Sequence, residues 1–351
     1  MDSSKQTNWA ARFAAMTVVC VLALIGIGGL VTSKGAGMAV PDWPTTYGYN
    51  MFLFPISQWH GGIFYEHTHR LAATVIGYLT IILAVWLCFS EPRRWVKIMG
   101  LAAVFLVALQ GLLGGLRVTL LKDVLGVFHA ALAQVFLCWI ACIAFVGSRW
   151  WKTIQANPLE FEASRSLKNS FFIATTLVFT QLILGATMRH QHAGLAVPDF
   201  PLAYGKIWPP TDPVFVDKIN QSRIDVRDFK PITPFHINIH MAHRVGAFVV
   251  LATVLLAWMK ARSGFSPSHP LRKLSNFWLG IVVIQAGFGM FTVWFNKPAD
   301  IATIHVLAGA ICLLTGVLGS LALARLTHLA TIHGNPLTAA TPRVTQTTAI
   351  T

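Results

Sequence analysis

The sequence predicts an all-α polytopic membrane protein with eight transmembrane helices, arranged as two four-helix bundles that repeat one another. Of its 351 residues, 55% are hydrophobic and only 11% are charged, and the mean hydropathy is +0.60. In soluble domains, by contrast, about a quarter of the residues are charged. Apolar runs of about 20 residues, the length that crosses a hydrocarbon core of ~30 Å, occur eight times. A loop motif and a His-Arg pair each occur twice.

The eight predicted spans follow one another along most of the chain. They cover approximately 13–32, 70–89, 96–116, 124–147, 170–188, 241–259, 274–295 and 301–324. The first run is too long for a signal peptide and leads into further spans, and the residues before it lack the Arg-rich and Ser-rich length of a transit peptide. We therefore expect the first run to remain as a helix.

The net charge of +14 arises mostly from lysines and arginines at the ends of spans. They gather on the side that receives the N-terminus, the 148–168 and 260–273 loops and the C-terminal tail. By the positive-inside rule both termini are predicted to be cytoplasmic. Membrane orientation explains this charge better than nucleic-acid binding does, and we expect a multi-pass protein of the bacterial plasma membrane.

All five cysteines fall within predicted spans, and none lies in a loop predicted to be external. They are Cys20, Cys88, Cys138, Cys142 and Cys312. The sequence therefore predicts neither a disulfide nor a Cys-rich metal site. The spacing of Cys138 and Cys142 would allow both to bind one metal, but two small buried hydrophobic residues are the favoured interpretation.

An internal repeat relates the two halves of the chain. The stretch GAGMAVPDWPTTYGY at 35–49 recurs as HAGLAVPDFPLAYGK at 192–206. Further matching pairs are His69 with His243, Arg70 with Arg244, Gln110 with Gln285, and His129 with His305. Because each unit holds an even number of spans, both copies enter the membrane in the same direction. This predicts parallel bundles related by a pseudo-two-fold axis along the membrane normal.

The repeat also divides the chain into regions. We expect an N-terminal bundle at 1–150, a cytoplasmic linker at 151–168, a C-terminal bundle at 169–328 and a polar tail at 329–351. The repeated loop is rich in Gly, Pro and aromatic residues, which favours a structural lid at the membrane interface over direct chemistry. No chemistry is assigned to the hydrophilic insertion at 211–235.

Four histidines lie near the predicted external ends of even-numbered spans: His69, His129, His243 and His305. Ionisable residues inside spans are costly, so each one suggests a function. One imidazole from each of two helices per bundle suits axial ligation of a haem iron, and glycines in spans three and seven would admit the flat ring. The alternative is a histidine that is merely hydrogen-bonded at the interface. Zinc or copper would need clustered ligands that are absent.

The charged residues beside these histidines each have a possible functional role and a structural alternative. Arg70 and Arg244 could bind haem propionates through two-pronged donors, or snorkel to the interface. Glu66 precedes His69 by three residues on the same helix face, and His240 takes its place in the second half. A carboxylate can move protons or stabilise a developing cation, so the N-terminal site is predicted to be catalytic. The alternative for Glu66 is a solvated carboxylate at a helix start.

The other histidines are predicted to have no special role. His67 should point elsewhere on its helix. The remaining seven are expected to be ordinary surface residues, namely His60, His190, His192, His236, His269, His328 and His333.

With its E-x-x-H-R motif at 66–70, its H-R pair at 243–244, the later histidines His129 and His305 and the duplicated loop, the chain resembles the haem A synthase family. The resemblance implies oxidation of the C8 methyl of haem O to a formyl by successive hydroxylations. It implies that His243 and His305 hold a haem b cofactor, and that His69 and His129 hold the substrate haem O. From their recurrence beside the histidines, we expect Arg244 to bind the haem b and Arg70 the substrate haem. Glu66 would then assist the chemistry. Many bacterial members carry an external cysteine pair, which this chain lacks.

Two other functions compete with this one. A di-haem b-type electron-transfer membrane protein has no evident need of a carboxylate at only one haem, so the difference between Glu66 and His240 favours the enzyme. A transporter would place its polar site near the bilayer midplane, whereas here the polar residues gather toward one face. For the enzyme, the expected partners are haem O, the lipid bilayer and a neighbouring haem O synthase.

Overall fold

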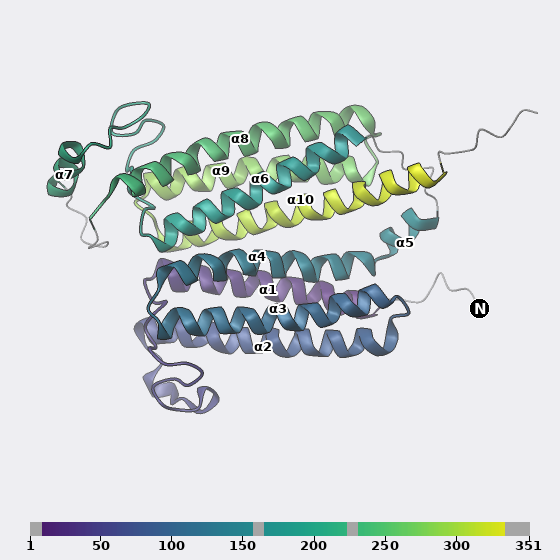
Figure 1. Cartoon of the computed structure of the whole chain (residues 1–351), viewed down its shortest axis with the longest axis horizontal. Coiled ribbons are helices and arrows are strands. Elements are labelled where there is room, and N and C mark those ends of the chain that lie inside the picture. Colours follow the sequence, from purple (N-terminus) through teal and green to yellow (C-terminus); the bar gives the residue numbers. More distant parts are fainter. Residues whose placement is uncertain (1–8, 157–164, 223–230, 334–351) are drawn as a thin grey trace, which may run out of the picture.

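A computed structural model describes residues 9–156, 165–222 and 231–333 of the chain, and it consists of long helices in two groups (Figure 1). Eight helices in these ranges are long and apolar enough to cross a membrane. The described residues form no strand, only two isolated bridges, Thr46 with Tyr49 and Ala203 with Lys206. The predicted all-α fold with eight spans is confirmed.

The N-terminal group is a ring of four helices. It contains α1 (Trp9–Ser33), α2 (Gly61–Ser90), α3 (Arg94–Thr119) and α4 (Asp123–Val146). Each helix packs against the next, and α4 closes the ring on α1. Leu83, Leu137 and Ile140 are fully buried between the helices, so the centre of this bundle is apolar.

The C-terminal group repeats the arrangement. It contains α6 (Arg165–His190), α8 (Pro234–Gly264), α9 (Pro270–Trp294) and α10 (Ala299–His333), and α10 closes the ring on α6. Trp278 is fully buried, stacks near Phe171 and donates its indole N–H to the carbonyl of Cys312 at 2.9 Å. This hydrogen bond satisfies the polar atom of a large aromatic side chain inside the bundle.

Three helix pairs join the two bundles: α1 with α10, α4 with α6, and α4 with α10. In the repeat, α1 corresponds to α6 and α4 corresponds to α10. The α1–α10 pair is then the counterpart of the α4–α6 pair, and the α4–α10 pair is its own counterpart. Small residues allow close approach here, since a Cβ added to Gly29 would lie 3.0 Å from Cγ2 of Thr303. The pseudo-two-fold axis and the exact domain boundaries stay predictions.

Shorter elements connect the helices. They are the 3-10 turns η2 (Met51–Leu53) and η3 (Ile56–Gln58), α5 (Arg149–Ala156) between the bundles, and α7 (Pro213–Ser222) in the insertion. α7 packs Val216 and Ile219 with Ile237 of α8 and Ile232. The described part of the 211–235 insertion thus covers one end of the C-terminal bundle.

Two of the helices begin well before their apolar runs. α2 starts at Gly61 rather than near 70, and α8 starts at Pro234 rather than near 241. The extra turns carry polar residues such as Glu66, which hydropathy excludes from a span although it is buried against the loop. His69 and His243 therefore lie about two turns inside their helices, and the prediction that they open their spans is wrong.

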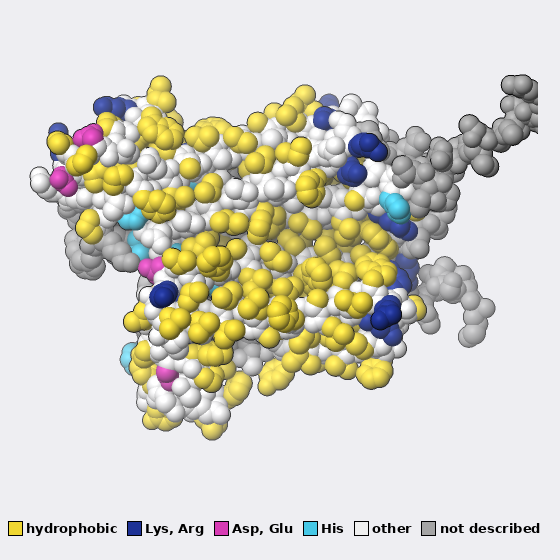
Figure 2. All heavy atoms as spheres, viewed as in Figure 1, with side chains coloured by type: hydrophobic (Ala, Val, Ile, Leu, Met, Phe, Trp, Pro, Cys, Tyr) yellow, Lys and Arg dark blue, Asp and Glu magenta, His cyan; other side chains and the backbone are white. Residues whose placement is uncertain are grey.

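The surface separates by chemistry along the bundles (Figure 2). The flanks are largely hydrophobic, and most of the visible Lys and Arg side chains gather at the end that carries α5. Most of the Asp and Glu side chains visible in this view lie toward the opposite end, where α7 and the repeated loops are found. The five cysteines are free.

Candidate functional site

The four predicted ligand histidines lie on α2 and α4 of one bundle and on α8 and α10 of the other. Each ring packs against a glycine of a neighbouring helix. A Cβ added at that glycine would lie close to the ring's Cε1: 3.0 Å for Gly28 and His69, 3.2 Å for Gly114 and His129, 3.1 Å for Gly185 and His243, and 3.2 Å for Gly289 and His305. Glycine is therefore required for the rings to lie where they do.

The histidines of the C-terminal bundle face each other across a short gap. The ring centroids of His243 and His305 are 6.5 Å apart. Imidazole nitrogens bind metals at about 2.0–2.1 Å, so two imidazoles on opposite sides of one ion have ring centres roughly 6 Å apart. The pair thus fits one metal between the rings.

The donor set fits a haem better than a bare metal ion. Among the described residues, no group of three or more His, Cys, Asp or Glu side chains could hold a metal. A haem needs only two protein ligands, because the porphyrin supplies the other four. In the N-terminal bundle, His69 and His129 lie close enough to interact electrostatically, so both halves bring their two histidines near one another.

Hydrogen bonds fix the ring nitrogens of the two later histidines in the same way. Nδ1 of His129 lies 3.2 Å from the carbonyl oxygen of Gln110, and Nδ1 of His305 lies 3.1 Å from that of Gln285. With the Nδ1–H donated to a carbonyl, Nε2 carries the free lone pair that a metal requires. The backbone carbonyls of Gln110 and Gln285 therefore prepare both histidines as ligands.

The two earlier histidines differ from one another. Gln181 of α6 donates to the carbonyl oxygen of His243 at 2.7 Å, and its side-chain nitrogen lies 3.1 Å from Nδ1 of His243. Rotation of the amide group would present its oxygen to an Nδ1–H. Nδ1 of His69 has no hydrogen-bond partner among the described residues. Leu24 stands at the position of Gln181 in the first half, four residues before Gly28 as Gln181 is before Gly185.

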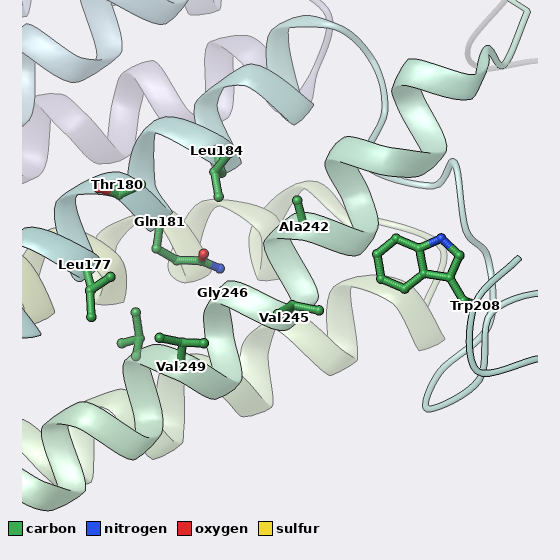
Figure 3. Close-up of a pocket in the computed structure, with 10 residues that line it drawn as sticks. Leu177, Thr180, Gln181, Leu184, Trp208, Ala242, Val245, Gly246 and Val249 are labelled. Atoms are coloured by element: carbon green, nitrogen blue, oxygen red, sulfur yellow. The ribbon is translucent and has the colours of Figure 1, made fainter. Parts of the chain in front are cut away.

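Gln181 also lines a groove between α6 and α8 (Figure 3). The groove has a volume of about 470 Å³ and is otherwise mostly apolar, with Leu177, Leu184 and Val249 on its walls. Gly246 makes room for the amide, because a Cβ there would lie 2.2 Å from the Gln181 side-chain oxygen. Gln181 thus reaches His243 through a gap that a larger residue would close.

Glu66 is buried, with 4% of its surface exposed. One carboxylate oxygen accepts from Arg70 Nη2 at 2.8 Å, and the other accepts from the backbone N–H of Val40 at 2.9 Å. The interpretation of Glu66 as a solvated helix-start carboxylate is wrong. Its counterpart His240 is also buried and donates from Nδ1 to the carbonyl of Ala193 at 3.3 Å.

The two arginines bind the repeated loops. Besides Glu66, Arg70 donates to the carbonyls of Val40, Asp42 and Thr45 at 2.7–3.0 Å. Arg244 does the same in the second half, with the carbonyls of Val197, Asp199 and Leu202 at 2.6–3.1 Å. These contacts engage both terminal nitrogens of each guanidinium. That either arginine binds a propionate stays a prediction.

Aspartates organise the same loops from within. Asp42 accepts from the N–H groups of Tyr47 and Gly48 at 2.8 and 2.9 Å, and the hydroxyl of Thr45 donates to it at 2.5 Å. Partial burial raises the pKa of Asp42, but the hydrogen bonds from Gly48, Thr45 and Tyr47 outweigh burial and hold it below its usual value. Asp199 repeats the arrangement. The network supports the structural-lid interpretation.

Three polar side chains near the sites were missed or misplaced by sequence reasoning. His190 was expected on the surface, but it is the last residue of α6 and is buried. Arg117 in the last turn of α3 lies in electrostatic range of Glu66, His69 and His129. Gln181 has no repeat partner, so only its spacing from Gly185 could have revealed it.

His67 is a further histidine that the structure buries. It is fully buried, its ring lies 5.1 Å from that of Phe54 and 4.7 Å from that of Trp59, and its Nδ1 is 3.2 Å from the hydroxyl of Thr46. As predicted, it points away from the ligand pair and toward the loop. It joins α2 to the structures that cover the N-terminal bundle.

Comparison with known proteins identifies the family of the chain. The family model described as cytochrome oxidase assembly protein matches residues 11–318. A heme A synthase from Nitrosomonas eutropha is 26% identical, covering 90% of this chain and 94% of that protein. Heme A synthases from Alkalihalophilus pseudofirmus and Bacillus cereus are 25% and 28% identical, covering 84% and 86% of this chain and 91% and 88% of those proteins. The chain therefore belongs to the COX15-CtaA family of cytochrome oxidase assembly proteins.

Proposed function

We propose that this protein is a haem A synthase, a membrane oxidoreductase that converts the C8 methyl of haem O to a formyl through successive hydroxylations. The observation that carries the proposal is the duplicated histidine pair, one in each bundle, with every ring seated on a glycine. Two haem sites suit an enzyme that has one haem as its substrate and a second haem as its cofactor. The names of the similar proteins support the same activity.

We assign the C-terminal pair, His243 and His305, to a resident haem b, and the N-terminal pair, His69 and His129, to haem O. A resident group benefits from ligands with fixed orientation, which Gln181 provides for His243. A substrate must also leave, and His69, whose Nδ1 has no partner in the described part of the chain, is the less constrained ligand. When bound, haem b supplies one-electron transfer.

Within the N-terminal site, Glu66 is the residue that we assign to assist the chemistry. Arg70 and the Val40 N–H hold its two oxygens, so the carboxylate is oriented before substrate binds. A fixed negative charge there stabilises positive charge that develops on the substrate and can take up a proton. Arg70 and Arg244 act as positioning residues, because they join each ligand helix to the loop beside its site.

We also infer the surroundings of the enzyme. The charge pattern supports an orientation with both termini in the cytoplasm and the histidine sites toward the external face of a bacterial plasma membrane. A haem O synthase in the same membrane is the natural source of a substrate as apolar as haem O.

The proposal is tested by extracting the haems that copurify with the protein from cells that make haem O and have no other source of haem A. We expect haem b together with haem A or a hydroxylated haem O, identified by mass. Haem b alone, at about two per chain, would instead establish the electron-carrier alternative. The His69→Ala variant should retain haem b and yield no haem A, whereas His243→Ala should lose haem b.

A second variant separates the chemistry of Glu66 from its structural contacts. Glu66→Gln keeps a side chain of the same shape with an oxygen that can still accept from Val40 or Arg70, so the loop should remain attached. We expect the bound haem b spectrum to be unchanged and haem A formation to be lost. A normal yield of haem A from this variant would remove Glu66 from the catalytic machinery.

A further inference from the structure

A group of basic side chains, with the histidine buried and the two arginines partly buried, lies where the two bundles meet at the loop end. It consists of Arg117, in the last turn of α3, with Arg189 and His190, the last two residues of α6; we call these three residues the basic cluster. A Cβ added to Gly126 of α4 would lie 2.5 Å from Cε1 of His190 and 3.0 Å from Nε of Arg117. Residues from both bundles thus meet over one glycine.

The cluster has unused hydrogen-bonding capacity. Nε of Arg117 is buried without a partner among the described residues. The two ion pairs in the described part of the chain are Arg70 with Glu66 and Arg93 with Glu91, so neither involves Arg117. Arg189 uses Nη2 to donate to the carbonyl of Gly29 and to the hydroxyl of Ser33.

The positive charge of the cluster exceeds the negative charge nearby. Arg117 and Arg189 lie close enough to repel one another. Asp123 and Glu66 are the carboxylates in electrostatic range of Arg117, and Glu66 is already paired with Arg70. Among the carboxylates of the described residues, none is therefore left to compensate one of the two guanidinium charges. Unpaired charge at this depth is costly, which favours binding of an anion from outside the chain.

The cluster stands beside the N-terminal histidine pair. Gly114 packs against His129, and Arg117 follows Gly114 by three residues, one turn nearer the loops on the same face of α3. Gly126, which packs against Arg117, precedes His129 by three residues on α4 and is likewise one turn nearer the loops. At 1.5 Å per residue this separation is about 4.5 Å, so the cluster lies immediately beyond the ligand level.

The cluster stands beside one of the two histidine pairs only. By the repeat, Thr292 takes the place of Arg117, and Thr32 and Ser33 take the places of Arg189 and His190. A general requirement of haem binding would have placed basic residues in both halves. Their restriction to the neighbourhood of the N-terminal histidine pair connects them with what is particular to that site, the substrate.

We propose that Arg117, Arg189 and His190 form the carboxylate-binding site for the two propionates of haem O. The assignment rests on the proposed function and deepens it by naming how the substrate is oriented. Arginine binds carboxylates through paired donors, and Arg117 still has an unpartnered donor, whereas both terminal nitrogens of Arg70 are engaged by the loop. Because α6 supplies two of the three residues, the C-terminal bundle takes part in holding the substrate of the N-terminal one.

The test compares haem O with its dimethyl ester, in which both propionates are neutral. Each is titrated into purified protein that retains haem b, and binding is followed by absorption. Wild type should bind the free acid about tenfold or more tightly than the ester, the effect of a charge-assisted hydrogen bond. Arg117→Gln should lose this preference by weakening the acid and leaving the ester unchanged, and Arg117→Lys should restore part of it. His190→Gln provides a second, smaller loss.

Lys122→Gln is the matched control, because it removes one exposed positive charge at the same end of the bundle. It should keep the wild-type preference, and an unchanged haem b spectrum verifies folding in every variant. Equal binding of acid and ester by wild type, or equal weakening of both by Arg117→Gln, would overturn the propionate assignment while haem O binding itself stands. Failure of wild type to bind either form would overturn the N-terminal substrate site as well.

Discussion

Gln181 and Leu24 occupy matching positions in the two halves, yet only Gln181 can hydrogen-bond a histidine. It contacts both Nδ1 and the carbonyl of His243, while Nδ1 of His69 is buried without a partner among the described residues. A hydrogen bond to Nδ1 fixes ring orientation and raises ligand basicity. One side chain therefore separates a firmly held ligand from a loosely held one.

Gln181→Leu should make the C-terminal site resemble the N-terminal one, because it removes the hydrogen bonds to His243 and introduces the residue found at the matching position. Loss of such an outer contact lowers metal affinity by about 10–100-fold, so we expect haem b to dissociate faster, and its reduction potential to rise because the ligand becomes less basic. Transfer of haem b to excess apomyoglobin and a redox titration measure the two effects. Leu24→Gln is the reciprocal variant and should slow release of haem from the N-terminal site. Unchanged haem b retention in Gln181→Leu would contradict this role.

At the scale of residues, the repeat identifies the histidines, because chemistry that occurs twice in register stands out from composition. It could not identify Gln181 or Arg117, whose counterparts are Leu24 and Thr292. The repeat also could not predict that Arg70 binds loop carbonyls. Every residue has a backbone carbonyl, so the sequence does not show which ones accept a hydrogen bond. His190 was misassigned because a polar residue at a helix end resembles a loop residue until its neighbours are known.

Among the elements, the first copy of the repeated loop packs closely against α3 at Trp43. A Cβ added to Gly115 would lie 2.3 Å from Cδ2 of Trp43, so the indole occupies the space of the missing side chain. We expect Gly115→Ala to displace the loop and destabilise the protein by about 1–3 kcal/mol, the usual cost of overpacking. Thermal unfolding in detergent measures the change.

Gly111 on the same helix is the control for this prediction. Nothing lies within 4 Å of a Cβ added there, so Gly111→Ala should be neutral or stabilising, because alanine favours the helix. Equal effects of the two substitutions would mean that helix propensity, rather than the Trp43 contact, determines the outcome.

The loop aspartates predict a pH dependence. Hydrogen bonds lower the pKa of Asp42 in the folded protein, so its stabilising contribution is complete above the unfolded pKa of about 4. It is lost as the pH falls through the lowered folded value. The unfolding temperature of wild type should therefore fall below pH ~4. Asp42→Asn should unfold at a lower temperature at pH 7 and show a smaller further decrease; an identical acid slope in both proteins would contradict the assignment.

Element boundaries illustrate what hydropathy can and cannot predict. The apolar runs located all eight spans, because crossing a bilayer requires that length of hydrocarbon surface. They missed the first turns of α2 and α8, where buried polar residues satisfy one another and the loops. Those turns carry Glu66 and His240, so the part of the helix that hydropathy missed is also the part closest to the proposed chemistry.

At the scale of the whole molecule, the two halves are more than neighbours. Arg189 of α6 donates to the carbonyl of Gly29 and the hydroxyl of Ser33 on α1, which ties the loop ends of the bundles together. The repeat predicted the bundles but not which helices would join them, since interface residues here are small and apolar like those that face lipid. The contact explains how a residue of one bundle can serve a site in the other.

The orientation of the molecule is the remaining whole-molecule prediction, and it follows from charge alone. Basic residues gather at the end that carries α5, and short loops rich in Lys and Arg stay in the cytoplasm. The opposite end, with both histidine pairs nearer to it, should therefore face outward. Cysteines introduced on each side and labelled with a membrane-impermeant maleimide distinguish the two orientations.

Ile207→Cys, on a side chain that is 87% exposed between α6 and α7, should react in intact spheroplasts. Ser266→Cys, exposed between α8 and α9, should react only after permeabilisation. Wild type supplies the background, because its cysteines lie within the spans. The reverse pattern would place the basic cluster and the histidines near the cytoplasm, and haem O would then have to reach its site from that side. The expected pattern, in which intact spheroplasts label Ile207→Cys and not Ser266→Cys, instead requires that haem O enter from within the bilayer or from its outer face.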